Sequence, residues 1–127
     1  MKATDMTQTE LEIMEALWAK GEPLFLGELL EYFNFRTGKD WKKQTMNTFL
    51  FRMQQKSLVE AVGGGRYKRY VPLITREKYT ADASRAFLDR NYGGSFARMF
   101  AALSGGEQID KEEIRELRRK LEEWEKQ

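Results

Sequence analysis

The side chains best suited to specific chemistry lie between positions 42 and 52, where amide, hydroxyl and basic groups recur at helical spacing. At 100° per residue, Gln44, Thr48 and Phe51 fall on one side of a helix, and Asn47 flanks them. Amides pair bidentately with adenine, basic groups reach guanine or phosphate, and apolar groups contact the thymine methyl. The pattern predicts that a DNA major groove is contacted by Lys42, Lys43, Gln44, Thr45, Asn47, Thr48, Phe51 and Arg52.

The alternative for this face is an ordinary solvated helix surface, and the charge distribution favours DNA. Residues 36–78 hold eleven Lys and Arg against three acidic residues, a net charge of +8, in a chain whose net charge is +2. Residues 1–35 carry −5 and residues 79–127 carry −1. A basic segment of this kind suggests a polyanion as partner, most often nucleic acid. Phe51 has two open interpretations, contact with a thymine methyl or packing sideways against the neighbouring hairpin.

The composition argues against catalysis and metal binding. The chain has neither cysteine nor histidine, which most nucleophile–base pairs and most zinc or iron sites require. We therefore expect no enzyme activity, no metal and no cofactor. No apolar run approaches the roughly 20 residues that cross a bilayer, and the first ten residues lack the layout of a signal peptide. We expect a cytoplasmic, bacterial protein with no membrane partner.

Three helices are expected before the basic hairpin. Thr7 and Glu10 have the spacing of a capping box, and the helix that they start should stop at Gly21. A second helix spans residues 26–33 without a clear N-cap, and residues 34–38 read as a loop. The third helix spans about 42–56, because an apolar stripe runs through Met46, Phe49, Leu50 and Met53.

A β-hairpin should follow, with strands at 58–62 and 66–71 that are joined by three glycines and end at Pro72. Arg66 and Lys68 lie just past its tip, where we expect them to bind phosphate and add affinity without sequence choice. The glycines could instead suggest a phosphate-cradling loop. That interpretation is weak, because neither the lysine followed by serine or threonine of a P-loop nor a following helix is present.

The remaining residues predict helices at 75–91, around 96–100, and from Asp110 onward, with breaks at 92–95 and 104–106. In the last helix, apolar residues have the 3-4-3 spacing of a two-heptad seam. A seam this short must pack on something larger, and a second subunit meets that need. The predicted dimer interface consists of Tyr79, Phe87, Phe96, Phe100, Ile114, Leu117, Leu121 and Trp124.

The fold class that follows is mainly α with a small β-hairpin. Three helices and a basic hairpin form a winged helix-turn-helix domain over residues 1–74, and residues 75–127 form a helical dimerisation domain. The predicted function is sequence-specific DNA binding by a homodimer on a pseudo-palindromic operator. The alternative is a protein-interaction scaffold that uses the same fold without sequence-specific DNA binding.

Several short motifs occur in a characteristic order along the chain. They are LEIM with LW at 11–18, DW at 40–41, TMNTFL with Arg52 at 45–52, FLDRNYGG at 87–94 and IREL at 114–117. In these motifs the chain resembles the penicillinase-repressor and methicillin-resistance-repressor family of bacterial transcriptional regulators. The resemblance implies a homodimeric repressor that leaves its operator on a signal, through an upstream sensor or protease. It also implies an operator with inverted TACA/TGTA-like elements.

Departures from the family pattern modify these expectations. Asn47 stands where the family often has arginine and Phe51 where it often has threonine, so a different base preference is expected. The position of the family's Asn-Phe cleavage pair is occupied by Ala102-Leu103, which puts induction by proteolysis in doubt. The copper-responsive branch uses a cysteine-rich tail, and the absence of cysteine excludes thiolate copper sensing.

Overall fold

The computed structural model describes residues 6–105 and 109–127 and divides into two compact units, residues 1–86 and 87–127. Helix α4 (Arg76–Tyr92) passes from the first unit into the second.

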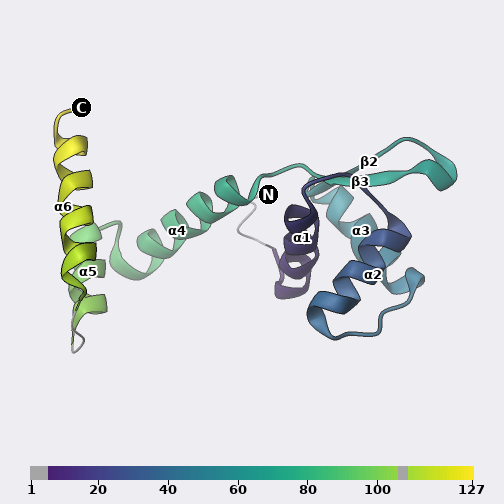
Figure 1. Cartoon of the computed structure of the whole chain (residues 1–127), viewed down its shortest axis with the longest axis horizontal. Coiled ribbons are helices and arrows are strands. Elements are labelled where there is room, and N and C mark those ends of the chain that lie inside the picture. Colours follow the sequence, from purple (N-terminus) through teal and green to yellow (C-terminus); the bar gives the residue numbers. More distant parts are fainter. Residues whose placement is uncertain (1–5, 106–108) are drawn as a thin grey trace. The chain divides into compact units, whose positions relative to one another are not determined.

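The first unit is a winged helix. Helices α1 (Gln8–Lys20), α2 (Leu26–Thr37) and α3 (Lys43–Gln55) pack in sequence, α1 on α2 and α2 on α3 (Figure 1). Strands β1 (Leu24–Phe25), β2 (Val59–Val62) and β3 (Arg69–Pro72) form an antiparallel sheet in the order β1-β3-β2. The hairpin of β2 and β3, with the 3-10 turn η2 (Gly65–Tyr67) at its tip, is the wing. The predicted fold class is confirmed.

One apolar core holds the helices and the sheet together. The stripe of α3 predicted from its spacing points inward, and its residues Met46, Leu50 and Met53 are fully buried. Each large side chain that is fully withdrawn from water stabilises the fold by about 1.5–3 kcal/mol, so this stripe sets the orientation of α3. The other large buried side chains are Ile13, Met14, Leu17, Leu24, Leu29, Phe33, Val59 and Tyr70.

Local capping signals place the helix starts as expected. The Thr7 hydroxyl accepts from the Glu10 backbone N–H at 3.1 Å, and the Glu10 carboxylate accepts from the Thr7 backbone N–H at 2.9 Å. Thr75 likewise accepts from the N–H of Lys78, and the Asp110 carboxylate accepts from the N–H of Glu112. These bonds satisfy amide groups that have no partner within the first turn of a helix.

Two expectations about α2 and its surroundings were wrong. Residues 34–37 are the last turn of α2, and only Gly38 is the left-handed C-cap, with φ +75°. The helix continues because the Thr37 hydroxyl donates to the Phe33 carbonyl and Asn34 finds partners beyond the helix end. Strand β1 was also missed, since two residues carry no periodicity and pair with β3 only in the folded chain.

The wing differs from the expected hairpin at its tip. Arg66 lies in η2 and β3 begins only at Arg69, although the strand was expected from residue 66. Gly63 makes the tight return possible, because its φ is +83° and a Cβ there would lie 3.0 Å from the Tyr67 carbonyl oxygen. The remaining strand boundaries, including the end at Pro72, agree with the expectation to within a residue.

The start of α4 is tied to α1 inside the first unit. The Trp18 indole N–H donates to the Ile74 carbonyl at 2.9 Å, and the Trp18 ring lies 5.8 Å from that of Tyr79. Arg76 and Glu15 form an ion pair at 2.6 Å. Tyr79, predicted for the dimer interface, thus packs on α1 of its own chain.

The second unit contains the end of α4, α5 (Phe96–Ser104) and α6 (Lys111–Glu125). Gly105 caps α5, and Gly106 of the predicted break lies outside the described residues. Among the described residues of this unit, only Leu88 is buried. No helix in the described part of the chain is long and apolar enough to span a membrane.

Candidate nucleic-acid interface

The outer side of α3 is open to solvent. All eight residues predicted between positions 42 and 52 are exposed, as are Arg66 and Lys68 in the wing. On the inner stripe of the same helix, Met46, Leu50 and Met53 are buried and Phe49 is partly buried, so one side of α3 packs on the core and the other faces solvent. This division is what the helical spacing predicted.

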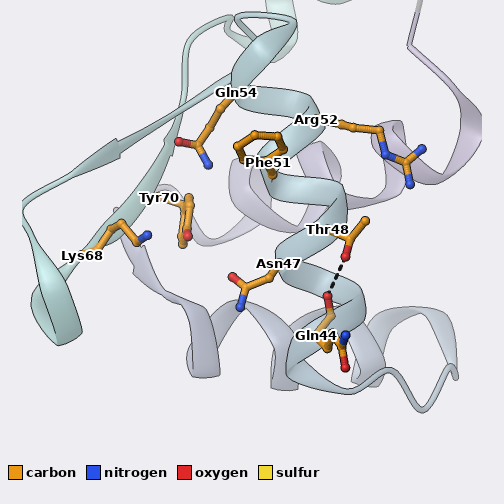
Figure 2. Close-up of a pocket in the computed structure, with 8 residues that line it drawn as sticks. All are labelled: Gln44, Asn47, Thr48, Phe51, Arg52, Gln54, Lys68 and Tyr70. Atoms are coloured by element: carbon orange, nitrogen blue, oxygen red, sulfur yellow. Dashed lines mark hydrogen bonds between the residues drawn. The ribbon is translucent and has the colours of Figure 1, made fainter.

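A groove between α3 and the wing brings the two predicted elements together. Asn47 and Phe51 come from α3 (Figure 2). Tyr70 comes from β3, and Lys68 lies just before that strand. Figure 2 shows Arg52 on the other side of α3, pointing away from the wing. The residues that line the groove are Gln44, Asn47, Thr48, Phe51, Arg52, Gln54, Lys68 and Tyr70.

The hydrogen bonds already formed on this face determine which donors and acceptors remain available to a ligand. The Thr48 hydroxyl donates to the Gln44 backbone carbonyl at 3.0 Å, so its oxygen lone pairs and methyl group face outward as acceptor and apolar contact. The exposed amides of Gln44 and Asn47 each carry two donors and an acceptor. The surface can therefore form paired hydrogen bonds with the edge of a base.

Two cations beside the groove lie over aromatic rings. The Arg52 guanidinium is centred 4.7 Å above the Phe49 ring, and the Lys68 ammonium lies 5.8 Å from the centre of the Tyr70 ring. In the third such pair, Arg69 lies 4.4 Å from the ring of Phe25 in β1. Rings that support cations restrict their motion and leave their polar ends free for an anion.

The structure divides the basic segment into two groups. Lys39, Lys56 and Arg76 form ion pairs with Glu12, Glu10 and Glu15, which all lie on α1. These three cations hold the fold together. Arg52 and Lys68 line the groove. Lys43, Arg66 and Arg69 are exposed as well, and Lys42 forms an exposed ion pair with Asp40. The net charge of +8 thus overstates the charge available to a polyanion.

The Glu10–Lys56 pair connects the start of α1 to the end of α3. Both carboxylate oxygens of Glu10 accept from the Lys56 ammonium at 2.8 Å. Burial by itself would raise the pKa of Glu10, but the hydrogen bonds from Lys56 and Thr7 outweigh it and the pKa is lowered. Glu10 is therefore ionised at neutral pH and anchors the C-terminal end of α3 through Lys56.

Asn34 holds the segment that leads into the other end of α3, a role that no pattern in the sequence indicates. Its side-chain amide donates to the Trp41 carbonyl and accepts from the Trp41 backbone N–H, both at 3.0 Å. The Trp41 ring stacks on the Phe49 ring at a centroid distance of 4.9 Å and lies tilted by 44° against the Phe33 ring at 4.5 Å. These contacts fix the segment that leads into the first turn of α3, where Lys43 and Gln44 lie.

The comparison with known proteins identifies the family. The family model described as Penicillinase repressor matches residues 6–123. The chain belongs to the penicillinase repressor family. The resemblance seen in the motifs is thereby confirmed.

Two relatives match this penicillinase repressor family member over most of their length. The Penicillinase repressor of Bacillus licheniformis is 30% identical over 122 residues, 96% of this chain and 93% of the relative. The Methicillin resistance regulatory protein MecI of Staphylococcus aureus is 23% identical over 117 residues, 92% of this chain and 93% of the relative. A similar solved structure is the monomeric form of BlaI from Bacillus licheniformis in complex with the blaP half-operator, with TM-score 0.50 and 26% identity, over 61% of this chain and 92% of that one.

Sequence reasoning missed several residues of this repressor-family site. Gln54 and Tyr70 line the groove, and Arg69 lies over the ring of Phe25 in β1, although none was chosen as a site residue. Gln54 lies one residue off the outer stripe of α3, and Tyr70 was read only as part of a strand. Arg69 directly follows Lys68 in the basic run, and that adjacency was the one available signal.

Proposed function

We propose that this chain is a transcriptional repressor that binds double-stranded DNA in a sequence-specific manner. The observation that carries the proposal is the groove of Figure 2, where the exposed amides of α3 and the Lys68 ammonium of the wing share one surface. Such a surface can read base edges and hold phosphates at once. The family, and the half-operator bound by the solved relative, support the same function.

The contacts divide by chemistry. Gln44 and Asn47 would read base edges through their amides, and Thr48 would accept a hydrogen bond or contact a methyl group. The cations would bind phosphate, adding affinity that every sequence shares. They are Lys42 at the N-cap of α3, Lys43 and Arg52 on α3, and Arg66, Lys68 and Arg69 on the wing. Thr45, which is exposed on α3, belongs to the same proposed surface.

The second part of the proposal is a homodimer formed through residues 75–127, with residues 1–74 as the DNA-binding domain. A helical unit that buries only one described side chain leaves its apolar surface for a partner. Trp124 is 51% exposed and Leu121 46% exposed on the seam of α6. A symmetric dimer would recognise an inverted repeat. The proposed interface comprises Phe87, Phe96, Phe100, Ile114, Leu117, Leu121 and Trp124, with Tyr79 at its edge.

The cellular setting completes the proposal. A repressor of this kind works in the cytoplasm without enzyme activity, and an upstream sensor or protease would relieve repression. Ala102 and Leu103, the position of the family's cleavage pair, lie in α5, and Leu103 is 63% exposed.

Selection of random duplex DNA by the purified protein tests the function. We expect an inverted repeat to be enriched and its affinity to fall steeply with salt, because each neutralised phosphate releases counterions. Asn47→Ala should relax preference at one base position in each half-site, while the matched exposed amide variant Gln8→Ala should not. No enriched motif, together with salt-insensitive binding to a protein, would favour the scaffold alternative instead.

Sedimentation tests the dimer separately. Leu117→Glu with Leu121→Glu places charge on the apolar seam, and we expect monomers that bind DNA weakly. The control, Arg115→Gln with Arg119→Gln, changes the net charge equally on another face of α6 and should leave the dimer intact. A dimer that survives the leucine substitutions would refute this interface.

A further inference from the structure

The most exposed aromatic ring on the reading helix is Phe51, which is 62% exposed in the middle of the groove. The inner side of α3 is already filled by other residues, so the ring has no place in the core. Tyr70 lines the same groove and is only 2% exposed, yet Phe51 does not pack down over it. The structure thus leaves an apolar group standing among amides and cations.

We infer that Phe51 reads the 5-methyl group of one thymine in each half-site, an inference that rests on the proposed function. The thymine methyl is the apolar feature that a base pair presents in the major groove. A ring that is exposed in the free protein gains by covering that methyl, while the neighbouring polar side chains satisfy the hydrogen-bonding groups around it. Phe51 thereby determines specificity, whereas the cations beside it contribute affinity.

The position of Phe51 on the helix locates this thymine. Asn47 lies four residues earlier, about 6 Å along the axis of an α-helix. Base pairs in duplex DNA rise by about 3.4 Å each. The thymine that Phe51 reads therefore lies within about two base pairs of the base pair that Asn47 reads.

The experiment replaces single thymines of the selected operator by uracil, which removes only the methyl group. In each half-site we expect one particular thymine to be sensitive. Replacing that single thymine by uracil should weaken binding of the wild-type dimer about fourfold, which corresponds to the loss of one buried methyl group. The other thymines should tolerate the change. For the Phe51→Ala variant, the ratio of the affinities for the thymine and the uracil operator should fall to about one. The Phe51→Leu variant should keep part of the difference in affinity.

The control is Phe35→Ala, which removes an equally large ring that is 74% exposed on α2 and lies outside the groove. It should keep the fourfold ratio. If no single thymine shows a methyl effect, or if Phe51→Ala keeps the ratio, the inference is overturned while DNA binding stands. If selection enriches no motif, the proposed function fails and this inference fails with it.

Discussion

Replacing Asn34 by alanine tests how the start of the reading helix is held in place. The Asn34 side chain is half-buried and makes two hydrogen bonds of 3.0 Å with the backbone of Trp41. Each such bond contributes about 1 kcal/mol net, so Asn34→Ala should lower the free energy of unfolding by about 2 kcal/mol. Removing the side chain also leaves the carbonyl and N–H of Trp41 without their partners.

The functional effect follows from the position of Trp41. The residue leads into the first turn of α3, which carries Lys43 and Gln44. With the Trp41 backbone freed, this turn should fray and DNA affinity should fall, because the base-reading amides lose their orientation. Urea titration measures the stability, and hydrogen exchange of the Trp41 N–H reports the local opening.

Asn91 provides a matched control. Its amide donates to the Phe87 carbonyl at 3.0 Å, one turn earlier in the same helix, and the side chain is exposed. Asn91→Ala should change the free energy of unfolding by less than about 0.5 kcal/mol, as exposed surface substitutions do. If Asn34→Ala lowers the free energy of unfolding by as little as this, or leaves the hydrogen-exchange protection of the Trp41 N–H unchanged, the role assigned to Asn34 is refuted.

Three further predictions follow from the packing. Glu10→Gln should cost about 2 kcal/mol at pH 7 by weakening the charged hydrogen bonds to Lys56. Since the folded-state pKa of Glu10 lies below its usual 4.5, its stabilisation is full above that value and is lost as the pH falls through the folded pKa. Wild-type unfolding free energy should thus decline more steeply between pH 5 and 3 than that of the variant, and parallel curves would contradict this. Leu50→Ala should lower the free energy of unfolding by about 3 kcal/mol in thermal or urea unfolding, because the side chain is fully buried between α3 and the core. A loss below about 1 kcal/mol would mean that the core collapses around the cavity. Gly63→Ala should cost about 1–2 kcal/mol and weaken DNA binding through the wing, and an unchanged affinity would show that the wing tip makes no contact.

The sequence by itself determined the features that depend on neighbours within one or two turns. The start of α1 follows from the spacing of Thr7 and Glu10, and α3 follows from a stripe that repeats every three or four residues. The return of the wing follows from glycine at position 63, where the φ is positive. These features can be predicted from the sequence because the groups involved are separated by only a few residues.

Only the tertiary structure decided which residues meet across the chain. Glu10 and Lys56 are separated by 46 residues, and Trp18 and Ile74 by 56, so no local pattern indicates either pair. The same holds for the extension of α2 through residue 37, which depends on what Asn34 contacts beyond the helix. The division of the basic segment into cations that pair with α1 and cations beside the groove is likewise a property of the fold. The physical reason is that ion pairs and buried amide bonds form wherever packing brings complementary groups together, whatever their distance along the sequence.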